Sequence, residues 1–117
     1  VLLDVYDYLS QRIEVAVQAG ISREKIIVDP GIGFGKTLRH NAILMEGLSL
    51  FHGLGVPLLL GCSRKSFIAG LSKGEEAKDR LAGSLAGALK GAAQGCQILR
   101  VHDVAETSQA LSVWRAL

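Results

Sequence analysis

The sequence has few aromatic residues, no strong charge of one sign and no long apolar run, and each shortage excludes a class of protein. Aromatic residues make up 5% of the 117 residues and the formal net charge is +2, so the stacking platforms and basic face of a nucleic-acid-binding protein are missing. Charged residues interrupt every apolar stretch before it reaches the roughly 20 residues of a membrane span. We expect no nucleic-acid partner and no membrane segment.

Cysteine is also scarce. Cys62 and Cys96 fall at opposite ends of two predicted neighbouring strands, on the order of 17–20 Å apart at about 3.3 Å per residue. A disulfide tolerates a Cα separation of at most about 7 Å, so we predict two free thiols and a reducing, cytoplasmic setting. The three histidines have no metal-ligand spacing with each other or with the cysteines, and no protein-held metal is predicted.

The composition that remains is that of one folded domain. Hydrophobic residues make up 49% of the chain and the mean hydropathy is +0.31, values typical of a well-buried globular protein. The chain begins at Val1, inside a predicted helix and without an initiator Met, which suggests that further sequence precedes it.

Three apolar runs each lead into a polar loop. The runs are Ile26–Asp29, followed by a glycine-rich loop; Pro57–Cys62, followed by Ser63-Arg64-Lys65; and Cys96–Val101, which contains Arg100 and is followed by His102-Asp103. Each run is typical of a strand whose carboxyl end carries functional groups. The apolar periodicity predicts helices over Leu2–Ala19, Arg39–His52 and Glu76–Gln94, and a last helix after Asp103, with Asp103 and Glu106 forming a capping box.

The spacing of the strand ends favours a barrel. Asp29 and Lys65 are 36 residues apart and Lys65 and Arg100 are 35 apart, so one strand, one loop and one helix repeat at near-constant length. An open doubly wound sheet also alternates strands and helices, but its functional loops gather mainly at one switch point. We therefore predict an α/β fold with three parallel strands and four main helices: residues 1–117 as the C-terminal part of a (β/α)8 TIM barrel, with the last three βα units and the preceding helix.

One predicted helix has an unusual stripe of small residues. Gly83, Gly87 and Gly91 recur every four residues within Glu76–Gln94. Glycine in a helix interior costs roughly 1 kcal/mol against alanine, so a close approach to a neighbour should compensate. That neighbour is either the chain's own sheet or a helix of another subunit.

The glycine loop partly matches two nucleotide-binding motifs but fits neither. Gly35-Lys36-Thr37 matches the end of a P-loop, but Pro30 stands where the first glycine is required. The dinucleotide fingerprint fails as well, because Lys36 stands where the last glycine should be. A tight turn without a ligand would explain the glycines but not the strand-end Asp29 followed by Phe34.

Three segments together resemble signature motifs of bacterial dihydropteroate synthases, in order and at matching spacing across essentially the whole chain. They are Asp29-Pro30-Gly31-Ile32-Gly33-Phe34-Gly35-Lys36, Gly61-Cys62-Ser63-Arg64-Lys65-Ser66-Phe67-Ile68 and Arg100-Val101-His102-Asp103-Val104. The resemblance implies a TIM barrel that joins 6-hydroxymethyl-7,8-dihydropterin diphosphate to p-aminobenzoate and releases diphosphate, in folate biosynthesis. It also implies Mg²⁺ carried by the substrate diphosphate, a homodimer, and competition by sulfonamides.

The chemistry of the residues agrees with that resemblance. A carboxylate such as Asp29 can accept two N–H groups from the amino-pyrimidinone edge of a pterin, although such an Asp can also cap the next turn. Arg100 and His102 are two apart on one strand, share a face, and are suited to cradle a diphosphate leaving group. By resemblance, Lys65 contacts the pterin and borders the p-aminobenzoate pocket.

The remaining site residues rest on the resemblance. Phe34, Ser63 and, with least support, Arg64 lie on the p-aminobenzoate side, and Gly33 clears space beside the pterin. Phe34 could instead fill the core, and Cys62 is expected to be a small strand-end residue rather than a nucleophile. Lys65, Arg100 and His102 are thus the predicted catalytic residues.

Two other functions stay open from the sequence. One is a pterin-dependent methyltransferase barrel, which has no reason to keep both a Ser-Arg-Lys loop and an Arg-x-His pair. The other is a non-catalytic half-barrel that associates with itself through exposed edges. The family's earlier strands supply further pterin, diphosphate and metal contacts without a counterpart here, so we expect little or no synthase activity from these residues alone.

Overall fold

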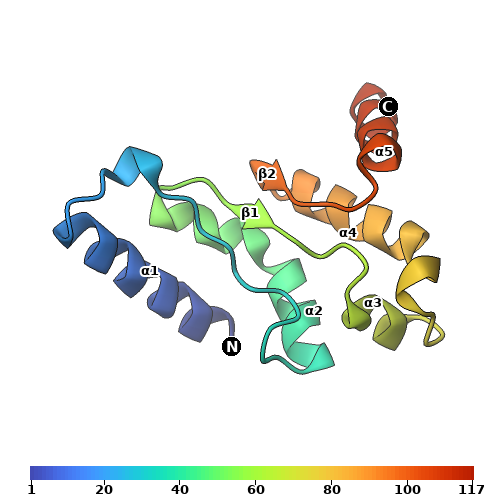
Figure 1. The fold of residues 1–117 in the computed structure, drawn as a ribbon, viewed down its shortest axis with the longest axis horizontal. Helices are drawn as coiled ribbons and strands as arrows, with labels where there is room; N and C mark the ends of the chain where they lie inside the picture. Colours follow the sequence, from blue (N-terminus) through green and yellow to red (C-terminus); the bar gives the residue numbers. More distant parts are fainter.

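The computed structural model describes residues 1–117 and alternates helices with short extended segments. Two strands, five α-helices and three 3₁₀ helices follow in this order: α1 Leu2–Gln18, η1 Arg23–Lys25, α2 Leu38–Glu46, η2 Leu48–Leu54, β1 Leu59–Leu60, α3 Ser66–Leu71, η3 Ala77–Asp79, α4 Leu81–Ala93, β2 Ile98–Leu99 and α5 Val104–Ala116. Figure 1 shows the extended segments side by side across the middle of the molecule. None of the helices combines the length and the apolar character needed to span a bilayer.

The sheet is smaller than predicted. Strands β1 and β2 pair in parallel, with Leu59 opposite Ile98 and Leu60 opposite Leu99. The predicted strand Ile26–Asp29 makes only an isolated parallel bridge, between Val28 and Leu58. The prediction of three strands is therefore wrong: the structure has two strands and one bridged segment.

Two prolines explain why the first segment pairs through a single residue. The Val28 N–H donates to the Pro57 carbonyl at 3.0 Å, and the Val28 carbonyl accepts from the Leu59 N–H at 2.8 Å. Continuing this parallel ladder would require the N–H of Pro30 in one direction and that of Pro57 in the other. Proline has no N–H, so the ladder stops on both sides of Val28.

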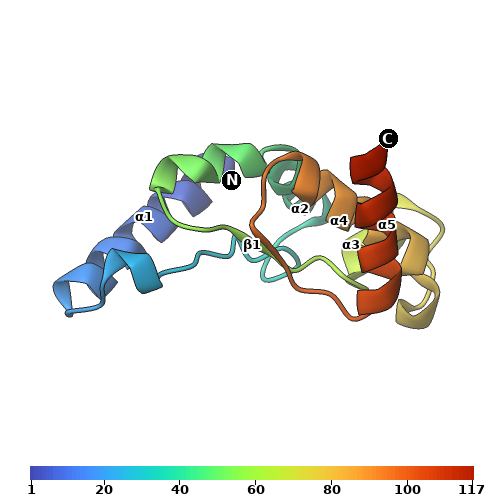
Figure 2. The same cartoon turned by 90° about the horizontal axis from the view of Figure 1, so that it is seen from above.

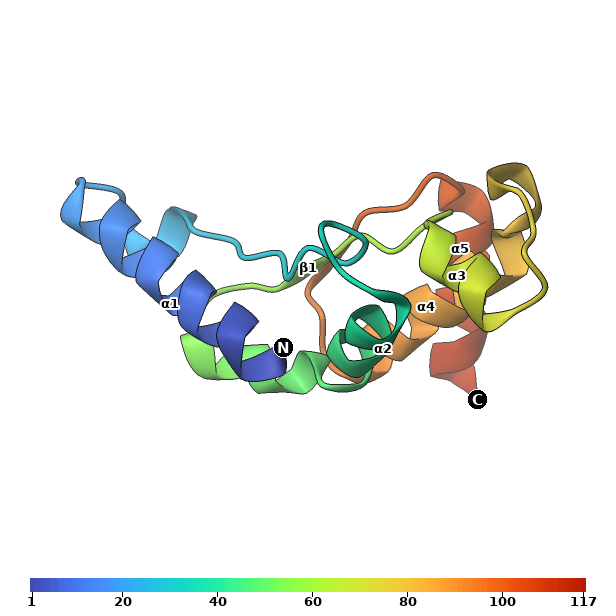
Figure 3. The same ribbon diagram turned by 90° about the horizontal axis from the view of Figure 1, so that it is seen from below.

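The helices cover one side of the extended segments, as Figures 2 and 3 show for α2 and α4. Val28, Leu58 and Leu60 point to that side and are buried with apolar side chains of α2 and η2. Ile27, on the opposite side of its segment, is 52% exposed. Only 24 of the 117 residues are buried, and large apolar side chains are exposed on the helices α1 and α5 as well as on the open side of the segments.

The predicted helices exist, but two of them are interrupted. Predicted helix Leu2–Ala19 ends one residue early at Gln18, and Gly20 follows with a positive φ of +100°. Predicted helix Arg39–His52 divides at Gly47 into α2 and the 3₁₀ helix η2. Predicted helix Glu76–Gln94 opens as the 3₁₀ turn η3 before α4 begins at Leu81.

The glycine stripe of α4 packs against this chain. A Cβ at Gly87 or Gly91 would lie under 3.0 Å from the side chains of Cys62 and Leu60 respectively, and one at Gly83 would collide with Ile68 of α3. The first of the two alternatives, packing within the chain, is therefore confirmed, with α3 as an additional neighbour. This contact brings α4 close behind the loop that follows β1.

The predicted capping box at the start of α5 is wrong. Asp103 is the N-cap residue, but its side chain makes no capping hydrogen bond. Its two carboxylate oxygens instead accept from the guanidinium of Arg64. The ion pair with a neighbouring loop has taken the place of the local cap.

Candidate functional site: a basic cavity at the strand ends

A cavity of about 410 Å³ opens where the loops after β1 and β2 meet. It is lined by Gly61, Ser63, Arg64, Lys65, Ala77, Arg100 and His102. Three of these residues are Arg or Lys, one is His, and none is acidic, so the cavity is suited to an anion. A second cavity, of about 430 Å³ between α2, α3 and α4, has mainly apolar walls and lacks this cluster of cations.

Lys65 connects this cavity to the glycine loop. Its Nζ donates to the Ile32 carbonyl at 2.5 Å and lies 4.6 Å from the centroid of the Phe34 ring. Desolvation lowers the pKa of Lys65, and the charge of Asp29 opposes that shift. Phe34 is 69% exposed, so it does not fill the core.

Gly33 allows the close approach of Lys65. Its φ is +86°, and a Cβ there would lie 3.0 Å from Lys65 Cδ. The predicted residues Gly33, Phe34 and Lys65 are therefore brought together, one strand end against the next.

Asp29 takes a different position. Its Oδ1 accepts the Gly31 N–H at 2.8 Å, which is the local turn considered as an alternative from the sequence, and the residue remains exposed. It lines a neighbouring cavity of about 290 Å³ with Lys36 and residues of α1, not the basic cavity. The carboxylate is thus both a turn former and accessible to a ligand.

Lys36, the lysine that makes the glycine loop resemble the end of a P-loop, forms its hydrogen bonds within that loop. Its Nζ donates to the carbonyls of Gly31 at 2.8 Å and Phe34 at 2.9 Å, closing the glycine loop on itself. The Gly33 N–H donates to Oδ1 of the buried Asn41 at 2.8 Å. Asn41 is a residue that the sequence reasoning missed; an amide in the first turn after the loop was the only signal.

Arg100 and His102 both line the basic cavity, just beyond the end of β2. Both are exposed, and Gly61 lies beneath Arg100, where a Cβ would be 3.8 Å from Arg100 Cβ. His102 Nδ1 lies 2.9 Å from the hydroxyl oxygen of the buried Ser63, which also accepts the His102 backbone N–H at 3.3 Å. Ser63 therefore orients the His102 ring toward the cavity.

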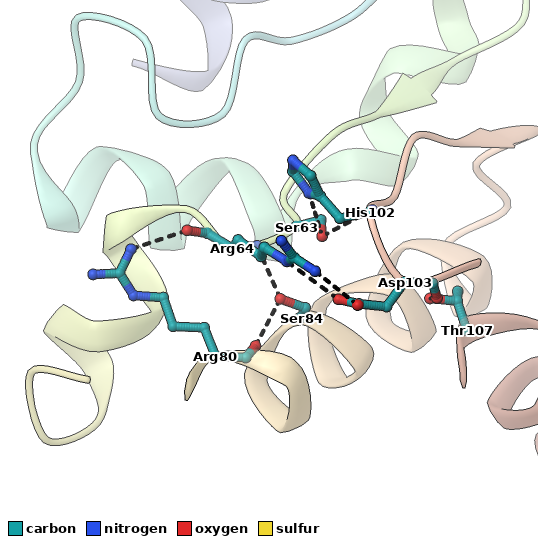
Figure 4. Close-up of polar contacts among 7 residues, drawn as sticks. All are labelled: Ser63, Arg64, Arg80, Ser84, His102, Asp103 and Thr107. Carbon is teal, nitrogen blue, oxygen red and sulfur yellow. Dashed lines mark hydrogen bonds and ion pairs between the residues drawn. The ribbon is translucent and has the colours of Figure 1, made fainter. Parts of the chain in front are cut away.

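Arg64 lines the cavity, but its guanidinium is engaged elsewhere (Figure 4). It donates to both carboxylate oxygens of Asp103, at 2.8 and 3.3 Å. This hydrogen bonding raises the pKa of Arg64 and lowers that of Asp103. Asp103, together with Arg80 and Ser84 behind it, was missed as part of the site, because residues from three separate loops and helices meet there.

The chain offers neither a nucleophilic thiol nor a metal-binding cluster at these strand ends. Burial raises the pKa of the Cys62 thiol to about 11, which keeps it protonated near neutral pH. No three His, Cys, Asp or Glu side chains come together in a way that could hold a metal ion. Asp103, the acid next to His102, is paired with Arg64, so this chain's residues do not fit a protein-held Mg²⁺.

The family to which this glycine loop and basic cavity belong comes from comparison of the chain with known protein families. Residues 1–102 match the family of pterin-binding enzymes, and the chain belongs to this family.

Relatives of the chain within that family include dihydropteroate synthases. The chain is 47% identical to the Escherichia coli (strain K12) enzyme over 116 residues and 48% identical to that of Neisseria meningitidis serogroup B over 117 residues. These alignments cover 99% and 97% of the chain but only 41% of each relative. The chain therefore spans about two fifths of the length of the curated relatives it matches.

Solved structures agree. The Xanthomonas albilineans dihydropteroate synthase with 4-aminobenzoic acid superposes with a TM-score of 0.96 at 44% identity, covering 98% of this chain and 42% of that structure. The Yersinia pestis dihydropteroate synthase gives a TM-score of 0.93 at 43% identity, covering 98% and 54%. The fold is thus part of a TIM barrel, as predicted, and the family resemblance read from the three motifs is confirmed.

Proposed function

We propose that this chain is the C-terminal portion of the pterin-binding barrel of a dihydropteroate synthase. The reaction joins 6-hydroxymethyl-7,8-dihydropterin diphosphate to p-aminobenzoate, giving dihydropteroate and diphosphate in folate biosynthesis. The observation that carries the proposal is the basic cavity, in which Lys65, Arg100 and His102 meet without a lining carboxylate. The synthase names of the relatives favour this function over a methyltransferase barrel.

Arg100 and His102 act on the leaving group. The C–O bond between the pterin methylene and the diphosphate breaks, and its electron pair goes to the diphosphate oxygen. Cationic donors at that oxygen stabilise the developing negative charge. The amine nitrogen of p-aminobenzoate then bonds to the methylene carbon and loses a proton, and no protein nucleophile is required.

The pterin ring lies between Asp29 and Lys65 in this proposal. The exposed Asp29 carboxylate accepts N–H groups of the amino-pyrimidinone edge, and the Lys65 ammonium, freed from the Ile32 carbonyl, donates to the pterin from the other side. Gly33 leaves room for the Lys65 stem, and Phe34 and Ser63 border the p-aminobenzoate side. Arg64 lines the same cavity, but its guanidinium is paired with Asp103, so this proposal gives it no substrate contact.

The partners follow from the substrates. Mg²⁺ would enter with the substrate diphosphate, as the family resemblance implies. A homodimer, competition by sulfonamides and a cytoplasmic setting remain predictions of the sequence. The two free cysteines agree with a reducing compartment.

Calorimetric titration of the full 117-residue chain with a non-reactive dihydropterin diphosphate analogue tests the proposal. We expect wild type to bind and Asp29→Asn to bind at least about tenfold more weakly, the loss expected for one charged hydrogen-bond pair. Asp7→Asn, at an exposed position of α1, is the matched control and should leave binding unchanged. Equal binding by wild type and Asp29→Asn would remove Asp29 from the site.

Turnover requires a complete barrel, so a chimera tests the reaction itself. This chain would replace the matching segment of the E. coli relative, and its synthase activity would be compared with that of the chain alone. We expect activity in the chimera and little or none in the chain alone. An inactive chimera that folds would contradict the proposed function.

A self-associating, non-catalytic half-barrel is the second candidate. The open side of the extended segments favours it, since Ile27 there is 52% exposed. Light scattering separates the two, because a monodisperse monomer that binds the pterin diphosphate analogue excludes self-association as the function.

A further inference from the structure

Arg64 has a backbone conformation that its side chain alone does not favour. With a φ of +59°, it is the only residue other than glycine in the left-handed region. A Cβ makes this conformation unfavourable, so surrounding contacts must hold it.

Those contacts come from the start of α4 (Figure 4). The Arg64 N–H donates to Ser84 Oγ at 2.9 Å, and the Arg64 carbonyl accepts from Arg80 Nη1 at 2.9 Å. Ser84 Oγ in turn donates to the Arg80 carbonyl at 2.7 Å. Both polar groups of the Arg64 backbone are therefore fixed by two residues one helical turn apart.

The side chain is fixed from the other neighbouring loop. Its guanidinium donates to both oxygens of Asp103, the residue directly after His102. Lys65 directly follows Arg64, and Ser63, which bonds to His102, directly precedes it. The Arg64–Asp103 pair thus lies between the elements that carry the cations of the cavity.

These side-chain pairs continue the register of the sheet. Leu59 pairs with Ile98 and Leu60 with Leu99, each 39 residues apart in sequence. Ser63 with His102 and Arg64 with Asp103 are also 39 residues apart. The parallel alignment of β1 and β2 therefore extends past the end of the backbone ladder, carried by side chains.

We propose that Arg64 is a positioning residue that acts through Asp103 and does not contact the substrate. Together with Asp103, Arg80 and Ser84 it forms a clamp that holds the loop after β1 in register with the loop after β2. The clamp keeps the side chains of Lys65 and His102 at the same cavity. The proposal rests on the proposed function only for the identity of the anion that the cavity binds.

A direct anion ligand and a clamp predict opposite effects of removing Asp103. If Arg64 bound the anion, Asp103→Ala would free its guanidinium and leave anion binding unchanged or tighter. If Arg64 is part of the clamp, Asp103→Ala weakens anion binding as Arg64→Ala does, and the double variant is little worse than either. Because the Asp103 side chain makes no capping hydrogen bond, Asp103→Ala removes no helix cap.

Calorimetry of the full chain with inorganic diphosphate measures these effects. We expect each single variant and the double variant to bind about tenfold more weakly than wild type. Arg39→Ala and Asp7→Ala, at exposed positions of α2 and α1, are the matched controls and should stay within about twofold. Unchanged or tighter binding by Asp103→Ala overturns the clamp.

A second measurement does not depend on diphosphate binding. Amide hydrogen exchange should become about tenfold faster at Arg64 in both Asp103→Ala and Ser84→Ala, and the ¹⁵N shift of His102 Nδ1 should move in Asp103→Ala. Amides in the middle of α1 serve as the internal folding control. If wild type fails to bind diphosphate, the proposed function fails, but hydrogen exchange still tests the clamp. Unchanged exchange at Arg64 together with an unchanged His102 shift would overturn the clamp.

Discussion

The glycine loop and the pair of loops after β1 and β2 look alike in the sequence but are held in different ways. The glycine loop is closed by its own contacts, since Lys36 donates to two carbonyls of the same loop and Asp29 accepts from Gly31. The other two loops are joined to each other by Ser63–His102 and Arg64–Asp103. A cation that uses most of its donors within its own loop is less available to an anion than one that lines the cavity.

The largest difference between the regions should appear when one cation is removed from each. We expect Arg100→Met to weaken binding of inorganic diphosphate by about 100-fold, the loss of a bidentate, fully charged donor. Lys36→Met should change that affinity by less than about threefold, because two of its three N–H donors are used inside the loop and the residue does not line the basic cavity. Calorimetry on both variants measures the contrast, and similar losses would mean that the glycine loop also binds the anion.

Lys65 belongs to both regions, and its ionisation gives a smaller, pH-dependent effect. Desolvation lowers the Lys65 pKa below the ordinary value of 10.5, so its charge is lost earlier than that of an ordinary lysine as the pH rises. We expect Lys65→Met to weaken diphosphate binding about tenfold near neutral pH and by less as the pH approaches 10.5.

Titrations of wild type, Lys65→Met and the exposed control Lys25→Met at several pH values separate this effect from the ionisation of diphosphate itself. Ionisation of Lys65 also makes the free energy of unfolding depend on pH, and the sign of that dependence is definite. The unfolded chain binds the Lys65 proton more tightly, so this group makes the free energy of unfolding rise with pH across the window below 10.5. A pH-independent ratio of the wild-type and Lys65→Met affinities would contradict the expectation.

A matched pair of glycines tests the contact between the regions. Gly33 and Gly35 both have positive φ, but a Cβ at Gly33 meets Lys65 at 3.0 Å while one at Gly35 meets nothing within 4 Å. Both alanine variants should lower the free energy of unfolding by about 1 kcal/mol through the backbone. Only Gly33→Ala should also weaken diphosphate binding, by about threefold, through displacement of Lys65. Urea unfolding and calorimetry measure the two effects, and equal affinities would show that the Lys65 stem moves without consequence.

The smallest effect concerns the ion pair at low pH. Hydrogen bonding from Arg64 lowers the Asp103 pKa below its ordinary value of 3.8, so the pair is intact above that value and is lost as the pH falls through the lowered pKa. An NMR titration of the Asp103 carboxyl carbon should show this shift, and Arg64→Ala should return the midpoint toward 3.8. An unchanged midpoint in that variant would mean that the Asp103 pKa is set by other groups.

The sequence predicted the order of elements and the cations of the cavity, because hydrophobic periodicity and strand-end residues are local signals. Arg100 and His102 line one cavity although both lie beyond the end of β2. The limited pairing of the first extended segment also has a signal in the sequence, since Pro30 and Pro57 each remove a donor from the ladder. Apolar composition alone predicts a strand there, because it does not register these missing donors.

Other features depended on contacts that local patterns do not encode. The partners of Lys36 are carbonyls of a loop whose course depends on the left-handed conformation of Gly31, Gly33 and Gly35. Asp103 had a local interpretation as a cap, and only the fold brings Arg64 near enough to compete for it. Ser84 and Arg80 carry no distinguishing signal in the sequence, because their contacts with Arg64 depend on the packing of α4 behind the loop after β1.

Because the side-chain pairs keep a constant separation of 39 residues, they limit where the connection between β1 and β2 can change in length. Removing one residue from the exposed stretch around Gly74 changes the sequence separation but leaves the strand ends where they are. Removing one residue between Leu60 and Ser63 would shift both Ser63 and Arg64 by one position relative to their partners His102 and Asp103. Tolerance of insertions and deletions should therefore be sharply uneven along the connection between β1 and β2, high at its outer turn and lowest within the few residues beside the cavity.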